Sequence, residues 1–148
     1  INAVSCFQID IIIENPMWTN TLDPRFSETD ALGHVNNTVL PVWFEDGRTP
    51  IFELFCPGMD TNNWHLIIAK IDVEFLAEIY YGKPVEVRTF MTKIGNSSMV
   101  VGHEAWQEGK LTAKGTAVMI HFDHETKSSK PIPDQSRAIL EQHFKTKD

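Results

Sequence analysis

The sequence predicts an α+β protein in which a five-stranded antiparallel sheet wraps around one long helix, with a short helix near the C-terminus. Three observations support this fold class. Apolar residues recur at three- and four-residue steps between residues 37 and 55, which is the pattern of one helix face. From residue 67 onward apolar and polar residues alternate, and short glycine-containing turns separate the later strands. Because an apolar helix beside a sheet buries its stripe only against one sheet face, we expect the sheet to curl around it.

The composition narrows the class of protein. The chain has 148 residues, with 13 basic and 20 acidic side chains and a formal net charge of −7. This length suits a single domain over residues 1–148. No apolar run approaches the roughly 18 residues that a membrane span requires. The acidic balance argues against nucleic acid or an anionic membrane as the main partner, although a few local cations can still bind a small anionic ligand.

The two cysteines, Cys6 and Cys56, are too few for a disulfide framework, and no spacing of Cys or His is typical of zinc ligands. We therefore expect a reduced, cytoplasmic setting and no metal. In the segment His121-Phe-Asp-His124, His121 and Asp123 project to one side of a strand, but a metal site there would need further ligands.

The first strand is predicted from Trp18 to about Glu28, after an N-terminal extension, residues 1–17, of uncertain structure. Within the extension, residues 6–13 fit either an extra strand or an ordered tail, and Asn15-Pro16 ends this stretch.

The long helix is predicted over residues 37–55. Its apolar stripe consists of Leu40, Trp43, Phe44, Gly47, Ile51 and Phe55. The glycine in this stripe, Gly47, would allow a close approach to the sheet, because it has no side chain.

Both ends and the middle of this helix carry further signals. Asn36 or Asn37 can cap its start by accepting a hydrogen bond from a free amide. Pro50 lacks the amide that an interior turn requires, which predicts a kink or break close to Thr49.

Four further strands are predicted after the helix. The first covers residues 67–75, where the apolar face is Ile67, Ala69, Ile71, Val73 and Phe75, and the opposite face is Ile68, Lys70, Asp72 and Glu74. The others span residues 85–94, 97–107 and 110–123, joined by the turns Gly95-Asn96 and Glu108-Gly109. A C-terminal helix is predicted at about residues 134–144.

Polar side chains gather directly before the long helix, where Asp30, Gly33, His34, Asn36 and Asn37 fall within eight positions. A helix N-terminus presents free amides, which can polarise a carbonyl whose oxygen becomes an anion during acyl transfer. A nearby carboxylate can activate water or attack directly, and Asp30 is the nearest. The same residues also fit a purely structural interpretation, in which Asp-x-x-Gly is a turn, the asparagines cap the helix and His34 satisfies backbone groups.

The motif Arg25-Phe-x-Glu-Thr-Asp-Ala-Leu-Gly-His-Val-Asn-Asn, followed by Phe44-Glu45-x-x-Arg48, closely resembles the 4-hydroxybenzoyl-CoA thioesterase branch of the hotdog-fold acyl-CoA thioesterases. The match is dense over residues 25–48, and the later strand order agrees with the family. The resemblance implies a hotdog fold and a homodimer with active sites at the subunit interface, often paired into a homotetramer. It also implies hydrolysis of a small-molecule acyl-CoA without a metal or other cofactor, since coenzyme A is part of the substrate.

The resemblance assigns roles by position. Asp30 matches the catalytic carboxylate, and His34 and Asn36 belong to the same catalytic loop. The amides from Val35 to Asn37 match the helix end that polarises the substrate carbonyl. The implied substrate-binding positions are Gly33, Val35, Asn37, Leu40 and Arg48.

Several alternatives stay open. Leu40 stands where the family usually has tyrosine, which keeps open a hotdog protein that binds acyl-CoA or a partner without turnover. Some hotdog enzymes use a helical glutamate, so Glu45 is a second candidate for the catalytic carboxylate. Arg48 can contact a phosphate or pair with Glu45. Dehydration of hydroxyacyl thioesters is disfavoured, because the hydratase subgroup spaces Asp and His by four residues, whereas Asp30 and His34 enclose three.

Overall fold

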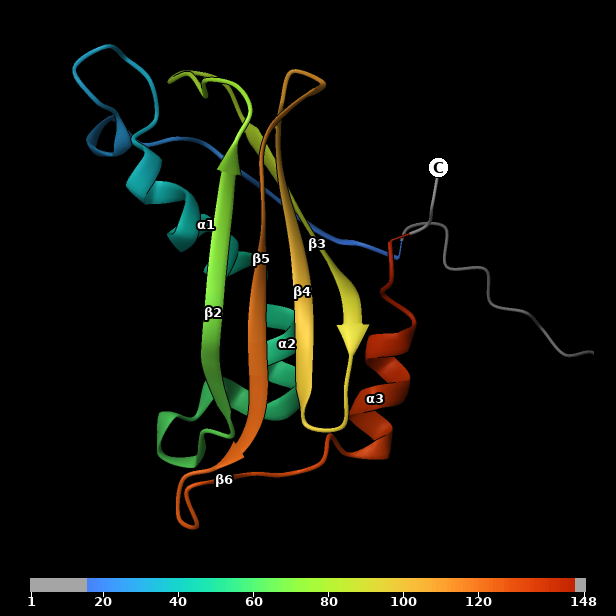
Figure 1. Ribbon diagram of the computed structural model, residues 1–148. Coiled ribbons are helices and arrows are strands. Elements are labelled where there is room, and N and C mark those ends of the chain that lie inside the picture. Colours follow the sequence, from blue (N-terminus) through green and yellow to red (C-terminus); the bar gives the residue numbers. More distant parts are fainter. Residues whose placement is uncertain (1–15, 146–148) are drawn as a thin grey trace, which may run out of the picture.

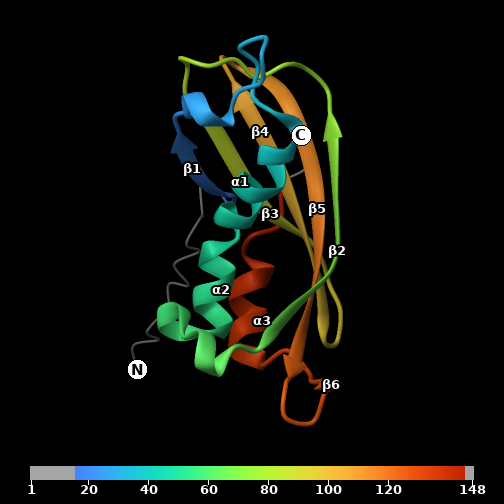
Figure 2. The ribbon, with the colours of Figure 1, turned by 90° about the vertical axis from the view of Figure 1, so that its left-hand side faces the viewer.

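The computed structural model describes residues 16–145, and the strand or tail predicted at residues 6–13 lies outside them. Within the described range the chain forms a six-stranded antiparallel sheet that curls around helices on one side (Figures 1 and 2). The strands are β1 (Trp18–Leu22), β2 (Leu66–Phe75), β3 (Val85–Ile94), β4 (Ser98–Gln107), β5 (Lys110–Asp123) and β6 (Ser128–Ser129). The helices are α1 (Leu40–Gly47), α2 (Thr49–Phe55) and α3 (Asp134–Glu141), with 3-10 turns at Phe26–Glu28, Asn37–Val39, Pro57–Met59 and Thr61–Asn63.

The strands lie in the order β1-β3-β4-β5-β2, and the short β6, which the sequence did not predict, pairs with β5. The two predicted hairpins join β3 to β4 and β4 to β5. In the second, Glu108 (φ 49°) and Gly109 (φ 74°) adopt the left-handed conformation of turns that match the twist of antiparallel strands. β1 ends at Leu22, short of the predicted Glu28, because Pro24 has no N–H to donate to the neighbouring strand.

The single long helix predicted over residues 37–55 is divided in the structure. Arg48 (φ −83°, ψ −2°) separates α1 from α2, so the break predicted close to Thr49 is confirmed. Pro50 cannot donate to the carbonyl of Asp46, and the hydroxyl of Thr49 donates to that carbonyl instead, at 2.7 Å. The one long helix is therefore corrected to a 3-10 turn followed by two short helices.

The predicted cap and the predicted close approach are both confirmed. Asn36 accepts a hydrogen bond from the N–H of Thr38 at its side-chain oxygen, at 3.0 Å. Gly47 brings α1 against β3, because a Cβ atom there would lie 2.7 Å from Thr89 Oγ1 and 3.2 Å from Val87 Cγ1.

β2 differs from the predicted alternation. A bulge between Ile68 and Lys70 shifts the register, so that Ile68 pairs with Met119 and Ile71 with Ala117. Directly paired residues point to the same side of a sheet, and Met119 and Ala117 belong to the core that faces the helices. Ile68 therefore joins the inner face, and Ile67 lies on the outer one, opposite to the prediction.

The inner face of β2 is also less buried than predicted. Ile68, Ile71 and Phe75 are 53%, 49% and 53% exposed in the single chain. Figure 2 shows the reason, because α1 lies over β1 and β3 while β2 forms the far edge of the sheet. The edge strand thus presents an apolar face that residues 16–145 do not cover.

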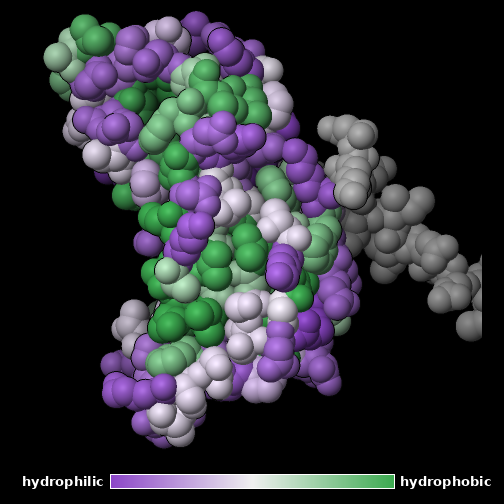
Figure 3. All heavy atoms as spheres, in the orientation of Figure 1, coloured by the Kyte–Doolittle hydropathy of each residue, from purple (hydrophilic) through white to green (hydrophobic). Residues whose placement is uncertain are grey.

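Two apolar clusters fill the space between the sheet and the helices. One surrounds α1 and includes Leu40, Trp43 and Phe44, and the other joins α2 to α3 through residues such as Ile51 and Leu140. The outer face of the sheet carries half-buried apolar residues over β4 and β5, including Val100 and Val118 (Figure 3). None of the helices within residues 16–145 has the length and hydropathy to cross a membrane. The curled antiparallel sheet with its enclosed helices fits the hotdog fold that the resemblance implies.

Candidate active site

Asp30 lies in the loop between β1 and α1, where its carboxylate closes a turn. Oδ1 accepts hydrogen bonds from the N–H groups of Leu32 (2.8 Å) and His34 (3.1 Å), and the Asp30 N–H donates to the His34 carbonyl (2.7 Å). Gly33 has a φ of 80°, which glycine adopts without strain. The turn expected for the Asp-x-x-Gly segment is therefore confirmed, and a catalytic role of Asp30 stays a prediction. The side chain is exposed in the single chain, so a catalytic role for Asp30 needs a second surface to enclose it.

The amides at the start of the helical segment do not all remain available. The N–H of Val35 donates to the carbonyl of Ile79 (2.7 Å), and the N–H of Asn36 donates to the carbonyl of Glu28 (2.8 Å). Within residues 16–145 the N–H of Asn37 has no hydrogen-bond partner. Of the three amides predicted to polarise the substrate carbonyl, those of residues 35–37, only the N–H of Asn37 has no partner among the described residues.

His34 connects this loop to the segment between β2 and β3. It forms an isolated antiparallel bridge with Tyr80, and the two rings meet edge to face at 5.0 Å. Its Nδ1 lies 3.3 Å from a carboxylate oxygen of Glu78. These contacts hold the loop in place, and contact of His34 with a substrate stays a prediction.

A cavity of about 410 Å³ opens beside the start of the helical segment, and we call it the Asn37 cavity. Its lining consists of Val35, Asn37, Leu40, Phe75, Leu76, Ala77, Glu78 and Ile79. Three of the predicted site residues, Val35, Asn37 and Leu40, are thus brought together. Asp30, Gly33, His34 and Asn36 belong to the adjoining loop and do not line this cavity.

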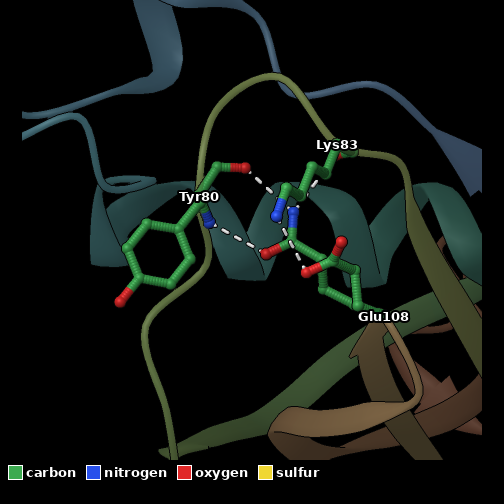
Figure 4. Close-up of polar contacts among 4 residues, drawn as sticks. Tyr80, Lys83 and Glu108 are labelled. Carbon is green, nitrogen blue, oxygen red and sulfur yellow. Dashed lines mark hydrogen bonds and ion pairs between the residues drawn. The ribbon is translucent and has the colours of Figure 1, made fainter.

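The segment that lines the Asn37 cavity is followed along the chain by residues 80–83, which Gln107 holds in place. The Gln107 Oε1 atom accepts from the N–H of Tyr80 at 2.9 Å, and its Nε2 donates to the carbonyls of Tyr80 (2.9 Å) and Lys83 (3.1 Å). Figure 4 shows this network, together with the ion pair between Lys83 and Glu108 at 3.0 Å.

Arg48 lines a second cavity, of about 350 Å³, which we call the Arg48 cavity. The other lining residues are Glu45, Phe52, Met59, Trp64, Leu66, Ile67, Ile68 and Met119. The arginine is only 4% exposed, and its Nη1 lies 3.1 Å from His103 Nε2. It does not form an ion pair with Glu45 within 4 Å, so the pairing considered from the sequence is absent in the single chain.

The imidazole beside Arg48 is neutral. Burial, and secondarily the charge of Arg48, lower the pKa of His103 from 6.5 to about 3. Its other ring nitrogen, Nδ1, lies 3.1 Å from the hydroxyl of Thr89, and its ring stacks on Phe44 at 4.9 Å. A neutral ring that accepts from the arginine at Nε2 carries its proton on Nδ1, from which it donates to Thr89.

Known proteins resemble this chain over most of its length. The profile of the thioesterase-like superfamily matches residues 24–140. The chain belongs to this superfamily. A predicted thioesterase from Bacillus stearothermophilus is 41% identical, with a TM-score of 0.85 over 89% of this chain and 99% of that one. A thioesterase from Thermus thermophilus, solved with coenzyme A and zinc, is 28% identical, with a TM-score of 0.74 over 85% of this chain and 92% of that one. YneP of Bacillus subtilis (strain 168), provisionally named an acyl-CoA thioesterase, is 27% identical over 75% of this chain and 82% of its own length.

In this thioesterase-like chain the described residues offer no ready-made metal site. Between residues 16 and 145 no three His, Cys, Asp or Glu side chains stand close enough to hold an ion together. His121 Nδ1 donates to the carbonyl of Pro131 (2.9 Å), and Asp123 accepts from the N–H of Glu125 (2.9 Å). The absence of a metal requirement stays a prediction.

Several residues that shape the site were not found from the sequence. Glu28 joins the loop to α1 by accepting from Trp43 Nε1 at 2.9 Å and from the N–H of Arg25 at 2.8 Å. Gln107 and His103 are the others, and neither belongs to a motif. Only Glu28 could have been identified from the sequence, because it lies inside the segment on which the resemblance rests.

Proposed function

We propose that the protein hydrolyses acyl-CoA thioesters to the free acid and coenzyme A, with Asp30 as general base or nucleophile. The observation that carries this proposal is the N–H of Asn37, which has no partner among the described residues; Asn37 stands at the start of the helical segment and lines a cavity, in a chain of the thioesterase-like superfamily. The coenzyme A bound to the Thermus thermophilus relative and the name of YneP support coenzyme A esters as the substrate class.

In the proposed reaction the thioester carbonyl accepts a hydrogen bond from the N–H of Asn37. If Asp30 is the base, it removes a proton from water, the water oxygen bonds to the carbonyl carbon, and the C–S bond breaks to release coenzyme A thiolate. If Asp30 is the nucleophile, a mixed anhydride forms first and water then cleaves it. In both routes the amide stabilises the oxyanion, an effect worth on the order of 10²–10³ in rate. His34 and Asn36 hold the loop that presents Asp30.

We propose that the protein is cytoplasmic and acts as a homodimer. A second subunit is needed because Asp30 is exposed in a single chain. Antiparallel pairing of two β2 edges would extend the sheet and cover the apolar residues of that strand. It would also bring residues 75–79 of one chain beside residues 66–68 of the second copy. The Asn37 cavity of one subunit would then meet the Arg48 cavity of the other, and a substrate would lie between subunits. A homotetramer could use the apolar outer face over β4 and β5.

The assignment to the 4-hydroxybenzoyl-CoA branch is a finer part of the proposal. It rests on the motif over residues 25–48 and on the position of Asp30 in the loop. Leu40, 2% exposed, supplies an apolar wall where the branch usually has a tyrosine hydroxyl. We therefore expect a different acyl preference from that of 4-hydroxybenzoyl thioesterases.

A protein that binds acyl-CoA without turnover is the second candidate. It is favoured by the contacts of Asp30, whose Oδ1 accepts from two backbone amides and whose side chain is exposed, as in a structural turn. Measured release of free thiol from short, long and aromatic acyl-CoAs distinguishes the two, because no turnover with any of them favours binding alone.

The decisive variant is Asp30→Asn, since asparagine keeps the oxygen that accepts from Leu32 and His34 but loses the charge. We expect turnover to fall at least roughly a hundredfold in a folded protein. Asp60→Asn is the matched control, because Asp60 also closes a turn through Oδ1 and the N–H of Asn62, at 2.9 Å. Unchanged activity in Asp30→Asn would move the role to Glu45, which Glu45→Gln then tests. A chelator is expected to leave the activity unchanged.

A further inference from the structure

Arg48 is a buried cation that forms no ion pair among the described residues. Its guanidinium has one hydrogen-bond partner within residues 16–145, the neutral ring of His103, and its Nε has none. No carboxylate of these residues forms an ion pair with it. A charge that leaves water normally gains an opposite charge, because the lost hydration is otherwise uncompensated. Burial accordingly lowers the pKa of Arg48, and the negative charge of Glu45 opposes this effect only in part. The described part of the single chain therefore places no anion in contact with the guanidinium.

The arrangement of the N–H donors on the guanidinium of Arg48 indicates which anion can bind to it. Nη1 is engaged with His103, so the donor edge formed by Nε and Nη2 is left. Two parallel N–H groups on one edge match the two oxygens of a carboxylate. Apart from Glu45 and Arg48, the walls of the Arg48 cavity are apolar and include Phe52, Trp64 and Met119. Such a cavity accepts a hydrocarbon chain and places a charged group only at its end.

We propose that the Arg48 cavity binds a carboxylate at the far end of the acyl group, so that the preferred substrates are ω-carboxyacyl-CoAs. This inference rests on the proposed function for the position of the thioester. In the proposed dimer the Asn37 cavity of one subunit would meet the Arg48 cavity of the other. An acyl group whose thioester lies at Asn37 would then extend across the interface into the Arg48 cavity of the second copy.

Glu45 lies on the same wall and is exposed. Its negative charge opposes a substrate carboxylate and does not affect a terminal methyl group. The proposal therefore predicts opposite effects for two neighbouring side chains. Removing the charge of Arg48 lowers the preference for ω-carboxyacyl-CoAs, and removing the charge of Glu45 raises it.

The experiment compares kcat/KM for pairs of acyl-CoAs of equal chain length that end in a carboxylate or in a methyl group. The ratio within each pair cancels any general loss of activity. We expect the wild-type protein to favour the carboxylate at least tenfold at its best length. Arg48→Met should abolish this preference, Arg48→Lys should keep part of it, and Glu45→Gln should increase it. Lys93→Met, at an exposed position of β3, is the control and should leave the ratio unchanged.

The outcomes separate this inference from the proposed function. If no acyl-CoA is hydrolysed, the proposed function fails, and the same ratio is measured from dissociation constants by calorimetry. Should Arg48→Met not fold, the wild-type ratio decides alone, because the absence of a preference for the carboxylate overturns the proposal. Equal losses for both members of each pair in Arg48→Met would also overturn it. That result, with a weakened dimer, would mean that the arginine binds a carboxylate of the second copy.

Discussion

The side-chain amide of Gln107 hydrogen bonds to both main-chain groups of Tyr80, as a neighbouring peptide would in a sheet. The N–H of Tyr80 donates to Oε1 and the carbonyl accepts from Nε2, each at 2.9 Å (Figure 4). Gln107 is the last residue of β4 and is 5% exposed. The next residue of the loop, Tyr81, donates its N–H to the carbonyl of Gly33 at 3.3 Å. Gln107 therefore acts on the loop of Asp30 through residues 80 and 81, as a positioning residue.

Gln107→Met should consequently lower both stability and turnover. The variant fills the same space but leaves the half-buried N–H and carbonyl of Tyr80 without these partners. A fully buried unsatisfied group costs about 1–3 kcal/mol, so we expect a loss toward the lower end of this range. We expect kcat to fall by more than KM rises, because the loop of Asp30 is displaced. Urea denaturation and steady-state kinetics measure the two effects. Lys83→Met is the control, since it removes only an exposed ion pair, worth less than about 1 kcal/mol. Equal behaviour of the two variants would contradict the positioning role.

Asn37→Pro tests the oxyanion donor without a large cost to the fold. The N–H that proline removes has no partner within residues 16–145, and the preceding residue, Asn36 (φ −64°, ψ 137°), already has the conformation that proline requires before it. We expect turnover to fall on the order of 10²–10³. Asn37→Ala keeps the N–H and should lose far less, and both variants should show the circular dichroism of the wild type. Comparable turnover in the two variants would exclude the amide as the donor.

The parts of the fold that follow from local chemistry could be predicted from the sequence. The hairpin at Glu108-Gly109 requires left-handed residues, the helix cap at Asn36 requires a short acceptor, and the break near Thr49 requires only that Pro50 lacks an N–H. The first strand is shorter than predicted, because Pro24 has no N–H to contribute to the ladder.

The parts that depend on tertiary contacts could not be predicted. The bulge in β2 leaves Ala69 unpaired, and nothing in the alternation marks which residue is skipped. The contact of Gln107 with Tyr80 spans 27 residues, and that of Arg48 with His103 spans 55. The motif before the helix located the candidate site, but only the structure separated the engaged amides of Val35 and Asn36 from that of Asn37.

Gly47→Ala is expected to have two opposite effects on the free energy of unfolding. Alanine favours a helix over glycine by about 1 kcal/mol. Its Cβ atom, however, would lie 2.7 Å from Thr89 Oγ1, which is fixed by its contact with His103. Overpacking of this kind costs about 1–3 kcal/mol, so we expect net destabilisation. A double-mutant cycle with Thr89→Ala, measured by urea denaturation, should show the cost of Gly47→Ala reduced once the hydroxyl is gone. Additive losses would show that the contact with Thr89 does not decide the effect.

The buried ring of His103 should make the stability of the protein sensitive to acid. Burial and the neighbouring Arg48 lower the pKa of His103 to about 3, whereas in the unfolded chain it has the ordinary value of 6.5. Between these values the unfolded chain binds a proton that the folded chain does not, so the free energy of unfolding falls as the pH falls from 6.5 toward 3. At pH 4.5 this contribution amounts to roughly 3 kcal/mol. Urea denaturation at pH 7 and pH 4.5, at one protein concentration, measures it.

His103→Gln removes this titration while leaving an acceptor for Arg48. It should therefore lose roughly 3 kcal/mol less than the wild type between pH 7 and pH 4.5. His124→Gln is the control, because His124 is exposed, and it should follow the wild type. If His103→Gln loses as much stability in acid as the wild type, the ring is charged in the folded protein. In that case its Nε2 cannot accept from Arg48, and the hydrogen bond that holds the guanidinium in its cavity is not formed.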